Sequence, residues 1–232
     1  KNVKEGKMDI MSQSVNQELI EFLDNSPTCF QAVENFRKML KDAGYSELLE
    51  CEKWEIVPGE KYFVTRNDSS IIAFSVPKKD FTGFQLICSH TDSPSFKIKE
   101  NAEMDADGKY TKLNVEGYGG MLCAPWFDRP LSVAGRIAVR TENGIETRLV
   151  NLDQDLAMIP NLAIHMNRQV NDGYAFNAQK DMLPLFCEAA EKQVKGCFTE
   201  LIAKEAGVKA EDILDTDLFL YNRMRGTLLG AD

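Results

Sequence analysis

The run Phe84-Gln85-Leu86-Ile87-Cys88 constrains the fold more than any other segment of this 232-residue chain. The run is nearly continuous in apolar residues, which is typical of a strand covered on both faces. Two amphipathic helical patterns precede it, from Ser14 to Leu23 and from Pro27 to Leu40, with Ser26 as the expected N-cap of the second. Helices followed by such a strand predict an α/β layer in the first part of the chain.

A second region begins near Lys99, where the expected strands become shorter and more polar. It predicts a β-rich domain inserted into the α/β one, which divides the chain into 1–99, 100–224 and 225–232. Strands are predicted over Lys61–Thr65, Ile71–Val76, Lys109–Val115, Ser132–Arg140, Glu146–Asn151, Ala163–Met166 and Asp217–Tyr221, and further helices over Leu183–Lys195 and Cys197–Ala206.

Charge and hydropathy exclude several classes of function. The 27 Lys+Arg and 36 Asp+Glu residues give a net charge of −9, and nucleic acid is not an expected partner because phosphate binding needs a basic face. Apolar runs such as Ile71–Phe74 are far shorter than the roughly 20 residues that span a membrane, and no apolar segment follows the charged residues 1–7. We therefore expect a soluble, cytoplasmic protein. Its six cysteines, without CxxC spacing, are expected to be reduced and mostly buried.

The chain has only two histidines, and the first follows the apolar run directly. His90 lies where the carboxyl end of the predicted strand would be, which is where open α/β sheets bind ligands. Asp92 is close enough to orient the imidazole or its metal. The alternative is a strand-end histidine that only caps a turn. The thiol of Cys88 could act as a nucleophile with His90 as its base, but a cysteine buried in a strand is usually inert.

His165 is predicted to lie on a strand between apolar neighbours, where a hydrogen-bonded core histidine and a ligand are both open interpretations. Gly119-Gly120 and the segment Trp126–Arg129 indicate a tight turn with an aromatic anchor. Within that segment, Asp128 and Arg129 are interpreted as structural rather than catalytic. The sequence contains no phosphate-binding glycine loop, no GxSxG and no HExxH.

Several segments, in order from residue 25 to about residue 165, resemble the aspartyl aminopeptidase family. They are Asn25–Thr28, Pro58–Asn67, His90–Pro94, Tyr118–Gly120, Trp126–Arg129, Leu131–Arg136 and Leu162–His165. The resemblance implies a two-domain metallo-exopeptidase with two zinc ions in an α/β catalytic layer. It also implies an inserted β-rich swivelling or dimerisation domain. The implied activity is removal of N-terminal residues, acidic ones among them, from peptide substrates by a homo-oligomer.

The resemblance also assigns roles to individual residues. It implies that His90 is a zinc ligand and that Asp92 is its partner in the catalytic site. It gives His165 two open roles, as a zinc ligand or as a substrate-binding residue that reaches a neighbouring subunit's site. Met121–Pro125 departs from the stretch that many members carry, which weakens any transfer of substrate preference.

The remaining zinc ligands and the glutamate base of the family would lie beyond Asp232. We therefore expect the α/β layer to be incomplete in this chain, and the chain alone not to be a competent two-zinc enzyme, because a zinc pair needs about five protein ligands. The alternative function is a noncatalytic assembly module that builds oligomer contacts.

Overall fold

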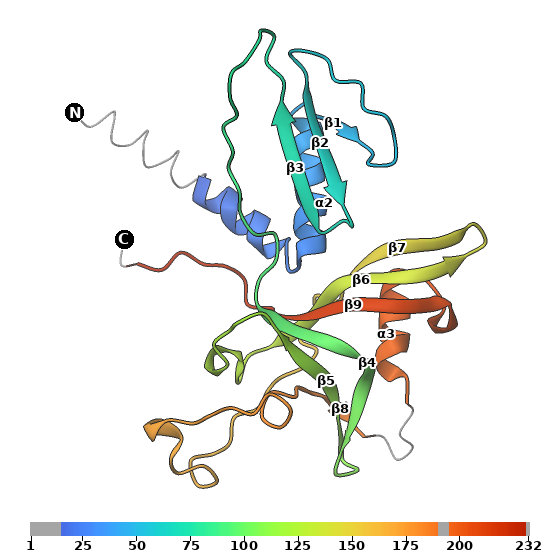
Figure 1. The fold of residues 1–232 in the computed structure, drawn as a ribbon. Helices are drawn as coiled ribbons and strands as arrows, with labels where there is room; N and C mark the ends of the chain where they lie inside the picture. The colour runs from blue at the N-terminus through green and yellow to red at the C-terminus, as the bar shows by residue number, and fades with distance from the viewer. Residues whose placement is uncertain (1–14, 190–194, 231–232) are drawn as a thin grey trace. The chain divides into compact units, whose positions relative to one another are not determined.

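A computed structural model of the chain describes residues 15–189 and 195–230 (Figure 1). The chain divides into two compact units, Lys1–Ser93 with Arg225–Asp232 and Pro94–Met224. Both units combine helices with open sheets, so the prediction of a mixed α/β fold is confirmed. No helix of the described residues is long and apolar enough to cross a membrane.

The first unit packs a helix against a three-stranded sheet of order β1-β2-β3. Residues 15–24 are helical, and α2 (Cys29–Asp42) follows. The strands are β1 (Ser46–Leu48), parallel to β2 (Lys61–Arg66), and β3 (Ser70–Ser75), antiparallel to β2. Phe30 and Val33 of α2 and Phe63 of β2 are buried and form the core of this unit.

The N-cap of α2 is Thr28, and the prediction of Ser26 as the cap was wrong. The Thr28 hydroxyl accepts a hydrogen bond from the Phe30 amide, as an N-cap should. Ser26 instead accepts a bond from the side-chain amide of Asn35 at 3.0 Å. The helix therefore begins two residues later than the position of Pro27 suggested.

The predicted inner strand Phe84–Cys88 is not a strand. Between β3 and the next strand, residues 76–94 form no regular structure, and the side chains of Phe84, Leu86 and Ile87 are 83%, 82% and 93% exposed. A strand exists only through hydrogen bonds to a neighbour, and none of the described strands pairs with this segment. Its apolar composition marks a segment suited to burial but does not supply the partner.

The second unit is built on a six-stranded antiparallel sheet of order β7-β6-β9-β4-β5-β8. Its strands are β4 (Ser95–Ala106), β5 (Tyr110–Tyr118), β6 (Leu131–Thr141), β7 (Gly144–Asn151), β8 (Leu185–Glu188) and β9 (Ile213–Asn222). The buried core includes Phe96, Leu113, Ile137, Leu218 and Leu220, and α3 (Cys197–Ala206) adds Phe198 and Ile202 to it. Short 3-10 turns occur at Ala124–Trp126, Val170–Asp172 and Ala210–Asp212.

Two predicted elements of this unit were wrong. Residues 164–166 form a turn, closed by a bond from the Met166 amide to the Ala163 carbonyl at 2.8 Å, and not a strand. The predicted helix Leu183–Lys195 contains β8 instead, and residues 190–194 lie outside the described part of the chain. Leu185 is held extended by two backbone bonds to Met158, of 2.8 and 3.1 Å.

Gly135 of β6 lies in close contact with the backbone of β9. Its φ of +152° is one that residues with side chains rarely adopt. A Cβ at this position would collide with the Asp217 carbonyl oxygen and lie 2.9 Å from the Leu218 Cα. Both contacts are backbone, which cannot move aside as the end of a side chain can.

We predict that Gly135→Ala destabilises the second unit by about 3 kcal/mol or more, from the clash and the strained φ together. Gly120→Ala is the control, because no atom lies within 4 Å of a Cβ built there. Urea unfolding followed by circular dichroism measures both variants. Equal stability of the two variants would contradict the close approach at Gly135.

Candidate functional site

His90 and Asp92 form a polar pair on the segment between β3 and β4. Nδ1 of His90 lies 3.1 Å from Oδ1 of Asp92. The His90 side chain is 90% exposed and that of Asp92 is 38% exposed. Thr91, between them, donates its hydroxyl to the Ser69 carbonyl at 2.7 Å, which anchors the segment to the turn between β2 and β3. The pair thus lies on an irregular segment that a side-chain bond ties to this turn, and not at the end of a strand.

This geometry suits a metal ligand with a supporting carboxylate. When Nδ1 donates its proton to Asp92, the Nε2 lone pair of the exposed ring is available for a cation, and imidazole nitrogen is a common zinc ligand. A zinc ion needs about three such protein donors. Within residues 15–189 and 195–230, no group of three or more His, Cys, Asp or Glu side chains is arranged to hold a metal. The pair therefore fits one ligand of a zinc site and does not complete it.

The cysteines differ from their predicted environment. All six are free thiols, but Cys51, Cys88, Cys187 and Cys197 are exposed and the other two are only half-buried. Cys88 is exposed because the strand expected to bury it is not formed. At the first residue of α3, partial burial raises the pKa of the Cys197 thiol, and the neighbouring Cys187 and Glu103 raise it further.

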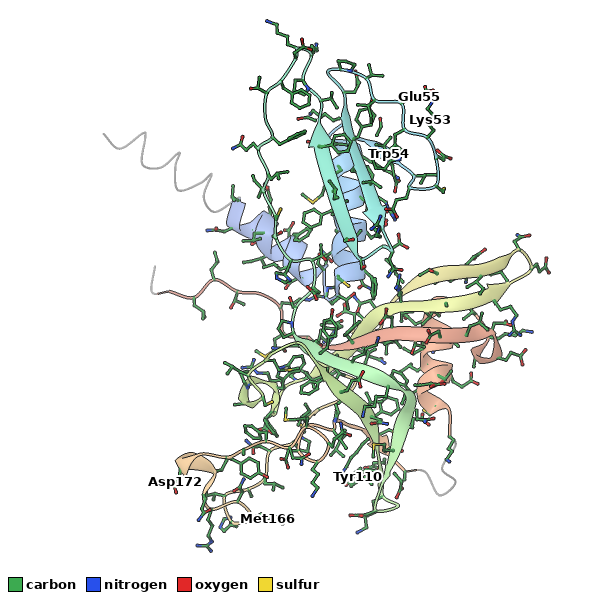
Figure 2. All side chains as sticks on the ribbon, viewed as in Figure 1. Lys53, Trp54, Glu55, Tyr110, Met166 and Asp172 are labelled. Carbon is green, nitrogen blue, oxygen red and sulfur yellow. The ribbon has the colours of Figure 1, made fainter. Side chains whose placement is uncertain are left out.

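His165 belongs to the second unit, whereas His90 and Asp92 belong to the first. It lies on an exposed turn rather than on an apolar strand face. Figure 2 shows the adjacent Met166, which is 76% exposed, and Asp172 on the same long loop, away from the strands. The core-histidine interpretation is therefore wrong, and the ring is accessible.

Asp128 holds the base of the loop that carries His165. Its amide donates to the Ile159 carbonyl at 2.9 Å, and its Oδ1 accepts from the Asn161 amide at 2.9 Å. Asp128 has a φ of +56°, a left-handed conformation that Asp tolerates better than most residues. The interpretation of Asp128 as structural fits this geometry, but its specific role was not apparent from the sequence because Asn161 is 33 residues away.

A cluster of aromatic and acidic side chains holds the C-terminal side of the same loop. The ring of Phe127 lies 5.0 Å from that of Phe176, which in turn lies 5.2 Å from Tyr174. Asp181 accepts from the Tyr174 hydroxyl at 3.3 Å and from the Asn177 amide at 2.7 Å. The negative charge of Asp181 raises the pKa of Tyr174. The His165 loop is thus fastened at both ends and exposed at its tip.

Known proteins resemble this chain over nearly its whole length. The sequence profile of the aminopeptidase I zinc metalloprotease (M18) family matches residues 22–232. The chain belongs to the M18 family. The resemblance stated from the sequence is therefore confirmed.

One curated M18 relative, the probable M18 family aminopeptidase 2 of Clostridium novyi (strain NT), is 47% identical over 220 residues, which cover 93% of this chain and 51% of the relative. A probable M18 family aminopeptidase 2 of Pseudomonas fluorescens (strain SBW25) is 41% identical, covering 96% of this chain and 53% of the relative. The chain spans about half the length of the curated relatives it matches.

Solved structures agree with this assignment. One described as the Ape4 and Nbr1 complex matches with a TM-score of 0.91 and 35% identity, over 97% of this chain and 47% of that chain. Another, described as the S. cerevesiae mApe1 dodecamer, matches with a TM-score of 0.75 and 25% identity, over 94% of this chain and 50% of that one.

We predict that Asp128→Ala loosens the His165 loop, because Ala lacks the acceptor for the Asn161 amide and tolerates the left-handed φ less well. Losing one such bond corresponds to about 5- to 30-fold faster amide exchange at Asn161 and Leu162. Hydrogen exchange read by NMR measures the effect. Asp128→Asn keeps an acceptor oxygen and should remain close to wild type. Equal exchange in the Ala variant would show that Asp128 does not hold the loop.

Proposed function

We propose that this chain forms part of a zinc metallo-aminopeptidase that removes N-terminal residues from peptides. The observation that carries the proposal is membership of the M18 family, together with relatives named aminopeptidases at up to 47% identity. Because the chain spans about half of those relatives, the proposed activity is that of a whole protein of their length. The alternative, a noncatalytic assembly module, is not favoured by these comparisons.

In this proposal His90 supplies one zinc ligand and Asp92 orients its ring. The support is the 3.1 Å contact between the two side chains and the exposure of the imidazole. Zinc bound at such a site polarises a scissile carbonyl and lowers the pKa of a bound water. We propose two ions, as the resemblance implies, with the further ligands in the part of the relatives that this chain does not match.

The exposed apolar segment also supports the proposal that the rest of the α/β layer lies in the part of the relatives that this chain does not match. Phe84, Leu86 and Ile87 carry the pattern of a strand covered on both faces, yet they are almost fully exposed here. We propose that this segment becomes an inner strand of the α/β layer when the rest of such a protein is present. The second unit would then be the inserted β-rich swivelling or dimerisation domain, and the cytoplasmic location stays a prediction.

The His165 loop is the proposed contribution of the second unit to the site. An exposed histidine on a fastened loop suits either proposed role, a zinc ligand or a residue that holds peptide substrate in a neighbouring subunit. A homo-oligomer is supported by the related structure described as a dodecamer. Selection of acidic N-terminal residues is the remaining part of this proposal.

Zinc titration of the 232-residue chain tests the ligand assignment. We expect no more than a single weakly held zinc, because only one imidazole and its supporting carboxylate are in place, and we expect no peptide hydrolysis. His90→Ala should abolish this binding, and Asp92→Asn should weaken it about 10- to 100-fold. Asp80→Asn, which changes an exposed carboxylate without a role in the proposal, is the matched control in the same chain. Two tightly bound zinc ions with turnover would show that the full ligand set lies within these residues.

A fusion of this chain to the unmatched half of the Clostridium novyi relative tests the activity. We expect zinc-dependent hydrolysis of aminoacyl anilides, lost in His90→Ala. His165→Ala then separates the two roles: a lower zinc content identifies a ligand, whereas a raised KM with unchanged zinc content identifies a substrate-binding residue. A folded, zinc-loaded fusion without hydrolysis would overturn the proposed function.

A further inference from the structure

The second unit carries two exposed cysteines that the proposed function does not use. Cys187 lies in β8, the edge strand of the six-stranded sheet, and Cys197 is the first residue of α3. Both are free thiols and both are exposed. Neither belongs to the His90–Asp92 pair or to the loop of His165, so any chemistry that they perform is separate from the proposed zinc site.

The register of the sheet shows which way Cys187 points. It lies directly opposite Thr111 of β5, and residues directly opposite each other carry their side chains on the same face. Thr111 shares that face with Leu113, two residues further along β5. Leu113 is fully buried in the core to which α3 contributes Phe198 and Ile202. The side chain of Cys187 therefore points to the face of the sheet on which α3 packs.

An aromatic contact joins the two segments that carry the cysteines. The ring of Phe186, next to Cys187, meets the ring of Phe198, next to Cys197, edge to face with their centroids 5.9 Å apart. The pairing of β5 with β8 shifts register here, which leaves Phe186 as an extra residue in β8. A bulge of this kind re-aims a side chain. It lets the neighbouring residues Phe186 and Cys187 both face α3.

Glu103 of β4 fixes the backbone on both sides of Cys197. Its two carboxylate oxygens accept hydrogen bonds from the amides of Gly196 and Phe198, each at 2.7 Å. A carboxylate at the first turn of a helix satisfies amides that have no partner within the helix. The start of α3 is therefore held in a defined position beside the sheet, and the thiol of Cys197 is held with it.

The two thiols are close enough to interact electrostatically. Partial burial raises the pKa of the Cys197 thiol, and the charges of Cys187 and Glu103 raise it further. These three side chains do not make a metal site, because among residues 15–189 and 195–230 no group of three or more His, Cys, Asp or Glu is arranged to hold a metal. The chemistry that fits two neighbouring, accessible thiols is disulfide formation.

We propose that Cys187 and Cys197 form a reversible disulfide, with a small-molecule disulfide such as oxidised glutathione as the oxidant, and that this bond fastens the start of α3 to β8. The Cys187 thiolate attacks one sulfur of the oxidant, which forms a mixed disulfide and releases one thiolate. The Cys197 thiolate then attacks the Cys187 sulfur and releases the second thiolate. Two protein thiols are oxidised, one external disulfide is reduced, and the two protons pass to the released thiolates.

The exposure of both cysteines makes the bond a regulatory one. External thiols reach an exposed disulfide and reduce it, whereas permanent structural disulfides resist reduction. The bond joins an edge strand to a helix across a short stretch of chain, so its main effect is to restrict the unfolded state of the second unit. This effect does not depend on zinc or on peptide hydrolysis.

Peptide mapping tests the bond in the 232-residue chain. The folded protein is treated with oxidised glutathione, its remaining thiols are alkylated, and it is digested with trypsin. Cleavage after lysine places the two cysteines in separate peptides, 181–192 and 196–204. We expect mass spectrometry to find these two peptides joined in the oxidised sample, and separate after reduction with dithiothreitol.

Three serine variants show whether the link is specific. Cys187→Ser and Cys197→Ser should each abolish the joined peptides. Cys51→Ser removes an exposed thiol of the first unit and should leave the link unchanged. Three results would overturn the proposal: no joined peptides in wild type, glutathione retained on Cys187 or Cys197 in place of the link, or loss of the link in Cys51→Ser.

Urea unfolding tests whether the bond fastens α3 to β8. Followed by circular dichroism, the oxidised chain should unfold at about 1 M higher urea than the reduced chain, because the cross-link restricts the unfolded state. Cys187→Ser, taken through the same oxidation, should show no such shift. An oxidised wild type that unfolds at the same urea concentration as the reduced protein would show that the folded unit does not accommodate the bond, and would overturn the proposal.

Discussion

β9 is the strand on which the second unit depends, because it lies between β6 and β4 and pairs with both. Without it, β4–β5–β8 and β6–β7 would be two separate groups of strands with their apolar faces only half covered. Phe219 of β9 pairs with Ala134 of β6 on one side and with Lys97 of β4 on the other. The strand comes last in this unit, so the sheet closes only when residues distant in sequence meet. The open backbone of Gly135 is what lets β6 and β9 approach closely enough.

The pairing of β9 with β4 also brings the two ends of the second unit together. β4 begins at Ser95 and β9 ends at Asn222, and these strands are neighbours in the sheet. The Ser95 hydroxyl donates to the Leu220 carbonyl, which ties the entering strand to the leaving one. Adjacent ends are what allow a domain to be inserted into another without distorting either. This arrangement supports the proposal that residues of the second unit form an insertion.

The sequence predicted those elements whose cause is local. α3 follows from its apolar spacing and from Gly207, whose φ of +66° ends it, and β6 and β7 follow from alternation around a short turn. β4 was missed because its outer half is polar and its register shifts between Ile98 and Glu103, so it is defined by its partners rather than by its own pattern. Of the candidate site, the closeness of His90 and Asp92 followed from their spacing. The exposed loop of His165 depends on Asp128, a contact that no local pattern reports.

The exposed segment and the His90–Asp92 pair are physically one feature. Burying an apolar run such as Phe84–Cys88 stabilises a fold by about 25 cal/mol per Å² of apolar surface removed from water. Among the described residues, neither a strand nor a layer covers this run. His90 follows this run by two residues, so in the proposed whole protein the strands that pair with the run would set the position of its ring. A metal ligand on such a segment couples ion binding to folding, since both the coordination geometry and the buried surface form in the same event. The bond from Thr91 to Ser69 holds the pair beside the β2–β3 turn, and in the proposed whole protein the strands that cover the run would complete the geometry of a zinc site.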